Sequence, residues 1–193
     1  MKHISVSLKE SIDGLNLKED SIVVDCTLGY GGHSSEILKR IKKGHLYAFD
    51  QDEEAIAFSS GRLSEIGDNF TIIHANFANL KEELEKRGIT KVDAILFDLG
   101  VSSPQLDEAD RGFSYHQDAK LDMRMDQTQA LSAYDVVNTF EEAELADIFY
   151  RYGEEKFSRS IAKNIVAARR EHPIETTLEL AEIIKNSVPE RVR

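Results

Sequence analysis

Three glycines follow a short apolar run near the start of the chain and could form a ligand-binding turn. Residues 22–25 are β-branched up to the carboxylate of Asp25, and Gly29, Gly31 and Gly32 come soon after it. Glycines adopt positive φ angles at low cost and let the backbone approach a ligand closely. Open α/β sheets bind ligands at the carboxyl ends of their strands. The pattern therefore predicts a nucleotide-like cofactor at this turn.

Two further aspartates end apolar runs in the same way. Asp50 closes residues 46–50, and Asp98 closes residues 92–98. If these runs are neighbouring parallel strands, Asp25, Asp50 and Asp98 meet at one edge of the sheet and form one site. Asp50 could accept both hydroxyls of an adenosine ribose, or it could cap the helix that follows. Asp98 would be costly to bury without a polar partner.

The residues around the turn discriminate between three kinds of cofactor. A Walker loop needs a lysine that His33 and Ser34 do not supply, and a dinucleotide fingerprint needs glycine where Ser34 stands. A pyrophosphate at about 4 Å from Asp25 would be repelled by about 4 kcal/mol at an effective dielectric of about 20. S-adenosylmethionine has no phosphate and carries positive charge. The sequence therefore favours S-adenosylmethionine, and we expect no metal centre.

Strand and helix signals alternate through the first half of the chain. This order predicts a parallel sheet with right-handed crossovers. The strand at 92–98 would lie at an edge, where its apolar side chains need cover. The predicted strands are residues 22–25, 46–50, 70–74 and 92–98, and the predicted helices are 34–43, 52–63 and 79–87.

The second half of the chain contains no predicted strand. Residues 104–132 are polar and resemble a loop, and helices are predicted at 141–152 and 154–170. A third helix begins at a capping box, Thr176 with Glu179, and ends before Pro189. We therefore expect a cofactor-binding core at 1–103 and a helical region at 104–193.

Charge and composition limit the partners of the chain. A net charge of −11 over 193 residues is unfavourable for binding free nucleic acid, which draws on Lys and Arg. The basic residues are unevenly spread, however. Four of them fall on one side of the predicted helix at 154–170, where they form either a solvated face or a phosphate contact: Lys156, Arg159, Lys163 and Arg170.

Cysteine usage and hydropathy indicate a cytoplasmic protein. Cys26 is the only cysteine, so no disulfide framework can form, and its place in the strand-to-turn motif favours a buried thiol in a reducing compartment. No segment resembles a signal peptide, and no run approaches the ~20 apolar residues of a membrane span.

The chain resembles the RsmH (MraW) family of methyltransferases, which modify the N4 amino group of a cytosine in small-subunit ribosomal RNA. The resemblance runs from His3 to the last residue and includes several long, unusual strings. These are residues 25–34 (DCTLGYGGHS), 98–107 (DLGVSSPQLD), 111–114 (RGFS), 121–126 (LDMRMD) and 152–155 (YGEE).

The resemblance implies a fold, a cofactor and site residues. The fold would be a class I (Rossmann-like) methyltransferase sheet with a helical insertion after the fourth strand. Residues 98–105 also look like a diverged form of the Asp/Asn/Ser-Pro-Pro-aromatic loop of DNA amino-methyltransferases. Either Asp98, or Ser102 and Ser103, could therefore hold the amino group of an unstacked cytosine in small-subunit ribosomal RNA, and our hypothesis favours Asp98 with Ser103. S-adenosylmethionine would contact Gly31, Gly32, His33, Asp50, Phe77, Asp98 and Gln105.

The family implies further strands beyond the last residue of this sequence, so we expect an incomplete sheet. Two alternatives to the ribosomal reading stay open: a cofactor-binding fragment without activity, and an amino-methyltransferase acting on DNA or a small molecule. An uncovered apolar edge also makes a homodimer plausible. Cys26 stands where the family usually has glycine.

Overall fold

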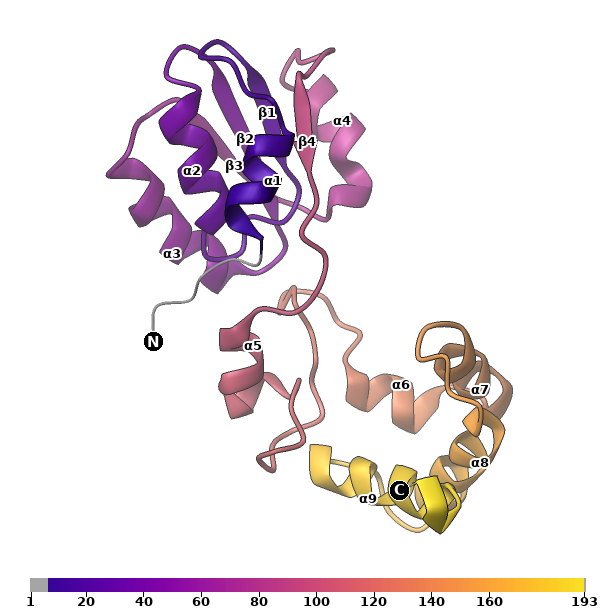
Figure 1. Cartoon of the computed structure of the whole chain (residues 1–193). Helices are drawn as coiled ribbons and strands as arrows, with labels where there is room; N and C mark the ends of the chain where they lie inside the picture. Colours follow the sequence, from indigo (N-terminus) through magenta and orange to yellow (C-terminus); the bar gives the residue numbers. More distant parts are fainter. Residues whose placement is uncertain (1–6, 193) are drawn as a thin grey trace. The chain divides into compact units, whose positions relative to one another are not determined.

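The computed structural model describes residues 7–192 as two compact units. One unit contains the described residues up to Gly100 together with Met125–Gln127. The other contains Val101–Arg124 and the chain from Thr128 onward. Figure 1 shows the sheet in the first unit and only helices and loops in the second. No described helix has both the length and the apolar character needed to cross a bilayer.

The first unit is built on a four-stranded parallel sheet. Its strands pair in the order β3-β2-β1-β4, with β4 at one edge. This arrangement confirms the predicted α/β class and the predicted edge strand. The fourth strand is shorter than residues 92–98 because it pairs only alongside β1. The strands are β1 (Ile22–Asp25), β2 (His45–Asp50), β3 (Phe70–His74) and β4 (Ala94–Leu96).

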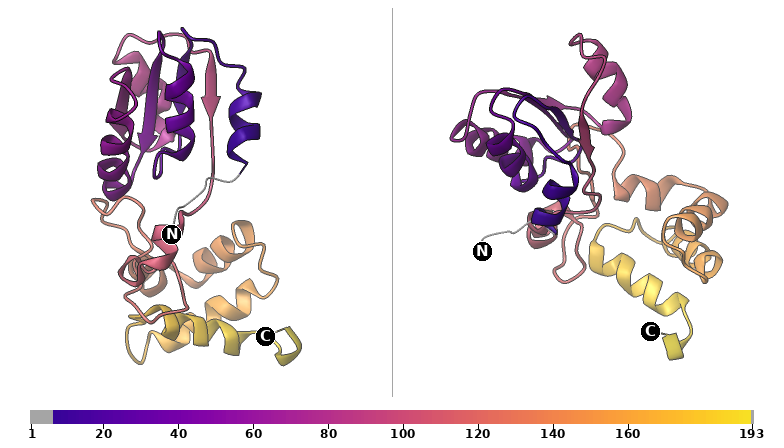
Figure 2. Two further views of the ribbon diagram at one scale, coloured as in Figure 1. Left: turned by 60° about the vertical axis from the view of Figure 1, so that its left-hand side comes forward. Right: turned by 45° about the horizontal axis from the view of Figure 1, so that its top comes forward.

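Helices cover both faces of this sheet unequally, as Figures 1 and 2 show. Successive residues of a strand point to opposite faces of the sheet, and each face has its own apolar core. Val23 and Leu46 pack with the first three helices, whereas Val24 and Phe49 pack with α4. A fully buried aliphatic side chain stabilises the fold by ~1.5–3 kcal/mol, so the strand ends are held firmly. The helices are α1 (Leu8–Gly14), α2 (Gly32–Arg40), α3 (Glu53–Ser64) and α4 (Leu80–Glu85), the last preceded by the short η1 (Phe77–Asn79).

Cys26 and the outer edge of β4 behave as the sequence predicts. Cys26 is a buried free thiol, and burial raises its pKa to about 12. Ile95 and Phe97 remain about half exposed on the α4 side of the sheet. No described strand pairs with the outer edge of β4, which leaves the peptide groups of that edge unpaired by any strand, whereas Ala94 and Leu96 pack against the core on the other face.

The second unit is helical and has its own apolar core. Leu121, Leu145, Ile161 and Ile174 are among its fully buried members. Three of its helices confirm the predicted ones. Its elements are α5 (Ser103–Asp107), η2 (Ala109–Arg111), α6 (Ala133–Thr139), α7 (Glu142–Arg151), α8 (Ser158–Ala168), α9 (Thr177–Ser187) and η3 (Glu190–Val192).

The prediction of a loop throughout residues 104–132 is wrong, because α5 and η2 lie in this region. Helices α1 and α6 were not predicted either. Both α5 and α6 begin with a capping box, formed by Ser102 with Gln105 and by Ser132 with Asp135. These reciprocal bonds satisfy the first peptide N–H groups and allow very short helices to form.

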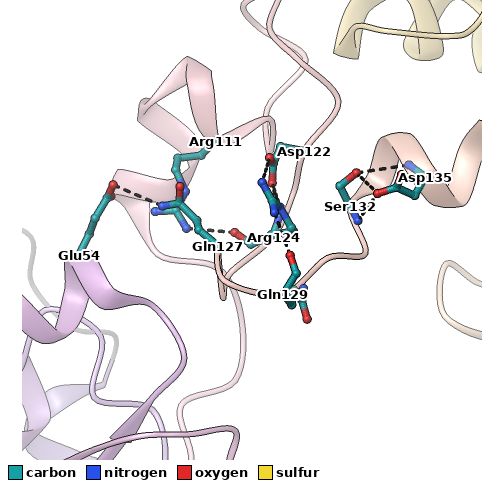
Figure 3. Close-up of polar contacts among 8 residues, drawn as sticks. All are labelled: Glu54, Arg111, Asp122, Arg124, Gln127, Gln129, Ser132 and Asp135. Atoms are coloured by element: carbon teal, nitrogen blue, oxygen red, sulfur yellow. Dashed lines mark hydrogen bonds and ion pairs between the residues drawn. The ribbon is translucent and has the colours of Figure 1, made fainter.

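The motif at residues 121–126 forms a hydrogen-bonded bend (Figure 3). The carboxylate of Asp122 accepts two bonds from the guanidinium of Arg124, at 2.9 and 2.7 Å. Arg124 also donates to the carbonyl oxygen of Gln129 at 2.8 Å, and Arg111 donates to that of Arg124 at 3.1 Å. The arginine next to Asp122 lowers the pKa of its carboxyl group. These contacts give the motifs at residues 111–114 and 121–126 a structural role.

Candidate cofactor-binding site

The turn between β1 and α2 requires glycine for conformational and steric reasons. Gly29 has φ 49° and Gly31 has φ 74°, both in the left-handed region. A Cβ on Gly31 would lie 3.1 Å from Oγ of Ser59 in α3. Gly31 is the N-cap of α2 and Gly32 is its first residue. The turn therefore leads directly into the N-terminus of α2, with Gly31 packed too closely against α3 for a side chain.

Neighbouring helices hold the turn in one shape. Side chains of α2 and α3 donate hydrogen bonds to three successive carbonyl oxygens. The remaining backbone groups of the turn are therefore presented in a fixed arrangement, which a ligand does not have to order. The three bonds are Ser59 to Gly29 (2.6 Å), Arg62 to Tyr30 (2.9 Å) and Ser35 to Gly31 (2.6 Å).

Asp25 supports the turn from inside the protein. Its side chain is fully buried at the end of β1 and accepts hydrogen bonds from Oγ of Ser34 at 2.7 Å and from the peptide nitrogen of Thr27 at 3.1 Å. Burial raises the pKa of this carboxyl group, whereas the two hydrogen bonds act in the opposite direction. Asp25 therefore acts on a ligand through its field and through the shape of the turn.

Asp50 closes β2 beside the same turn. Its two carboxylate oxygens accept hydrogen bonds from the peptide nitrogens of Gly29 at 2.7 Å and Asp52 at 2.9 Å. Asp52, not Asp50, is the N-cap of α3, so the capping alternative for Asp50 is wrong. Burial raises the pKa of Asp50, and its backbone bonds lower it. Each oxygen keeps a second lone pair with which it can accept a ligand hydroxyl.

His33 and Asp98 face each other across the opening of the turn. His33 is only 5% exposed, and its Nδ1 lies 3.6 Å from Oδ2 of Asp98. Among the described residues, Nε2 of His33 has no hydrogen-bond partner although it is buried. The backbone of Asp98 is fixed because its N–H donates to Oγ1 of Thr27 at 2.7 Å. An unpaired buried nitrogen costs ~1–3 kcal/mol and points to a missing partner.

Phe77 lies at the start of η1, after β3. Its ring packs edge-on against Phe97, with the ring centroids 5.5 Å apart and the planes at 87°. Phe77 is half-buried against the α4 core, whereas Phe97 is more exposed. Sequence reasoning overlooked Phe97, although an aromatic residue directly before Asp98 was a visible signal.

Gln51 is a second residue that sequence reasoning missed. Its side-chain oxygen accepts a hydrogen bond from Asn76 at 2.9 Å, and its backbone oxygen contacts Nε2 of His74 at 3.1 Å. Its side-chain nitrogen lies 3.9 Å from Sδ of Met125. Gln51 thus ties the residue after Asp50 to the segment that carries Phe77. Nothing in the local sequence around Gln51 indicates these contacts.

The two remaining predicted residues belong to the second unit. Ser103 is the exposed first residue of α5, and Gln105 is buried in the same helix. The side-chain oxygen of Gln105 accepts a hydrogen bond from the peptide nitrogen of Ser102 at 3.0 Å. The structure therefore groups the glycine turn, His33, Asp50 and Asp98 within one unit and gives Gln105 a capping role in the other.

Known proteins match this chain over its whole length. The family model of the MraW methylase family matches residues 1–193. Two curated relatives are named ribosomal RNA small subunit methyltransferase H. The protein from Exiguobacterium sibiricum is 59% identical over 192 residues, and that from Oceanobacillus iheyensis is 55% identical over 193. Both matches cover 100% of this chain but only 62% and 59% of the relatives, so the chain spans about three fifths of their length.

Solved structures give weaker matches. An rRNA methylase from Streptococcus thermophilus is 29% identical, with a TM-score of 0.42 over 52% of this chain and 57% of that chain. A putative rRNA-methylase from Clostridium thermocellum is 28% identical, with a TM-score of 0.44 over 53% of this chain and 57% of that chain. The family model, by contrast, matches the chain along its whole length. This chain belongs to the MraW methylase family.

Proposed function

We propose that this chain binds S-adenosylmethionine at the β1–α2 turn and is the cofactor-binding part of an enzyme that methylates the N4 amino group of a cytosine in small-subunit ribosomal RNA. Family membership and the names of the curated relatives support the reaction class. The observation that carries the cofactor assignment is the buried, unpartnered Nε2 of His33 beside the glycine turn.

The residues around the turn fit this cofactor. Asp50 has free acceptor capacity for the two ribose hydroxyls, and a ligand polar group would satisfy His33. Asp25, Asp50 and Asp98 follow adjacent strands, so their combined field favours a ligand with positive charge over a diphosphate. When bound, S-adenosylmethionine supplies a methyl group on a positively charged sulfur.

The protein's own contribution to the reaction is mainly alignment. The lone pair of cytosine N4 is delocalised into the ring, so the amino group must be held in line with the methyl donor. Alignment of this kind contributes ~7–11 kcal/mol. Asp98 has a fixed backbone and a half-exposed carboxylate, which can accept a hydrogen bond from the amino group. We assign Asp98 this role together with Ser103, on a base that is unstacked from its RNA.

Cofactor binding is tested by equilibrium dialysis of the chain with labelled S-adenosylmethionine. Asp50→Asn should weaken binding because it removes half of the acceptor capacity of the side chain and its charge. Asp68→Asn is the matched control, since Asp68 is an exposed aspartate of the same unit. Equal affinities for the two variants, or preferential binding of a nicotinamide dinucleotide by the unaltered chain, would refute the assignment.

Methyl transfer is tested separately with small ribosomal subunits and with naked RNA. Label recovered as N4-methylcytosine from the subunits supports the whole proposal, and Asp98→Ala should then abolish transfer while the fold persists. Cofactor binding without transfer supports a cofactor-binding fragment, a reading favoured by the coverage of about three fifths of the relatives. Transfer to DNA or to a small amine instead of RNA would contradict the substrate assignment.

A further inference from the structure

The segment from Lys156 to Arg170 is basic in an otherwise acidic protein. It contains five Lys or Arg residues and no Asp or Glu, although the whole chain has a net charge of −11. Most of it forms α8, which packs between α7 and α9 in the second unit (Figure 1). An all-basic segment of this length concentrates positive potential on one helix.

Four of these cations are exposed, and we call this set the α8 basic face. Arg159 and Lys163 lie within α8, about 40° apart at 100° per residue, on the side away from the buried Ile161 and Ile165. Lys156 and Arg170 flank the helix, two residues before its start and two after its end. All four are exposed, and within the described residues none of them forms an ion pair or a side-chain hydrogen bond. The α8 basic face consists of Lys156, Arg159, Lys163 and Arg170.

Two neighbouring carboxylates, those of Asp147 and Glu155, form other contacts, and two exposed ones, those of Glu154 and Glu171, flank the basic segment. Asp147 of α7 binds Arg151 at 2.7 Å, and the carboxylate of Glu155 accepts a hydrogen bond from the peptide nitrogen of Phe157 at 2.7 Å. Lysines and arginines elsewhere on the surface commonly form ion pairs, as Lys86 and Arg87 do with Glu83. None of the four cations of the α8 basic face pairs with a carboxylate among the described residues, so their charge can meet an external anion.

The tight turn that leads into this segment carries an exposed aromatic residue, four residues before Lys156. A Cβ on Gly153 would lie 2.8 Å from the carbonyl oxygen of Phe149, so the turn between α7 and α8 requires glycine. Tyr152, directly before it, is 84% exposed, and Tyr150 is 65% exposed. Exposed aromatic rings next to cations are the two components of single-stranded nucleic-acid binding, because phosphates meet the cations while bases stack on the rings.

We propose that the α8 basic face binds the sugar–phosphate backbone of RNA and that Tyr152 stacks on an unpaired base. This inference rests on the proposed function, because it takes RNA to be the methyl acceptor and assigns the surface that holds it. A membrane-binding helix would instead expose its apolar side, whereas Ile161 and Ile165 are buried here. An acidic protein partner would pair with the cations of the α8 basic face, but its binding would not require the exposed Tyr152.

The test compares two variants with the same change in net charge. In the first, Lys156, Arg159 and Lys163 are each replaced by Glu. In the matched control, three exposed lysines of the first unit that form no ion pair with a described residue are replaced by Glu: Lys18, Lys42 and Lys91. Affinity for a fluorescein-labelled single-stranded RNA is measured by anisotropy over a series of salt concentrations, with circular dichroism to verify folding.

The first variant should bind RNA more weakly. The magnitude of its slope of log affinity against log salt concentration should also fall by about 2, because each of the three phosphate contacts contributes ~0.7 for a single strand. The control should keep the slope of the unaltered chain. Tyr152→Ala should weaken binding roughly 5- to 150-fold without changing the slope, because stacking releases no counterions. Equal losses in the two charge variants, or an unaltered chain that binds RNA without salt dependence, would overturn the inference.

Two further measurements separate this inference from the proposed function. Poly-glutamate that displaces the RNA at equal charge concentration, together with an unaffected Tyr152→Ala variant, would assign the face to an acidic protein instead. Dialysis with S-adenosylmethionine should give the same affinity for both charge variants and the unaltered chain. Failure of cofactor binding refutes the proposed function, whereas failure of the RNA measurements with intact cofactor binding refutes only the role of the α8 basic face.

Discussion

Alanine at Gly31 should destabilise the protein through two separable effects. The left-handed φ of 74° costs a residue with a side chain about 1–2 kcal/mol. The new Cβ would also lie 3.1 Å from Oγ of Ser59, which is held in place by its bond to Gly29. We therefore expect Gly31→Ala to lower the free energy of unfolding by more than the conformational cost alone, and to weaken cofactor binding because the turn must shift.

Two other glycines isolate these effects. Gly88 also has a positive φ, 75°, but its Cβ would meet nothing within 4 Å, so Gly88→Ala should show the conformational cost alone, about 1–2 kcal/mol. Gly61 lies inside α3 with an ordinary φ and open space, so Gly61→Ala should stabilise the protein by about 0.5–1 kcal/mol.

Urea unfolding followed by circular dichroism measures all three differences on one scale. The expected order of stability is Gly61→Ala above the unaltered chain, then Gly88→Ala, then Gly31→Ala. Only the last should lose affinity for S-adenosylmethionine in dialysis. A Gly31→Ala protein as stable as Gly88→Ala, with unchanged cofactor affinity, would refute the claim that the turn is both strained and sterically confined.

The remaining predictions concern buried groups around the same turn. Ser34→Ala should lower the free energy of unfolding by about 1–3 kcal/mol, because a fully buried oxygen of Asp25 loses its hydrogen-bond donor. Ser60→Ala, on the exposed side of α3, should change this free energy little. Equal urea midpoints for the two variants would contradict the reasoning. Burial raises the pKa of Asp25 above its ordinary value of 3.8, so the folded state binds this proton more tightly than the unfolded chain does. The contribution of Asp25 to stability should therefore fall as the pH rises from 3.8 through the folded pKa, and urea unfolding over a pH series should show that Asp25→Asn lacks this dependence. The pKa of Cys26 is raised to about 12, so the thiolate is nearly absent at pH 8; a disulfide reagent should modify Cys26 slowly in buffer and rapidly in urea, and fast labelling of the folded chain would show that the thiol is not buried.

The sheet and the glycine turn could be predicted because their signals are local. Near-continuous apolar runs, each followed by an aspartate or a histidine, marked β1, β2 and β3 within a residue of their observed limits. The fourth strand was predicted too long, because apolar content at 92–98 says nothing about how far a single neighbour offers pairing partners. Only Ala94–Leu96 lies opposite β1.

Parts of the site depend on distant contacts and could not be predicted in the same way. The acidic character of Asp25 was visible, but its complete burial under Ser34 depends on how α2 packs. The links made by Gln51 to Asn76 and Met125 join three segments that are far apart in sequence. The short helices α5 and α6 were missed because their apolar periodicity is weak, although their capping boxes could have revealed them.

The free side of β4 has a practical consequence for handling this protein. A strand with unpaired peptide groups and exposed Ile95 and Phe97 is a template onto which another extended chain can add. Samples should therefore associate as concentration rises, and sedimentation or light scattering at several dilutions is needed before any binding curve is interpreted. A charged substitution at Ile95 offers a way to keep the protein dispersed without altering the β1–α2 turn.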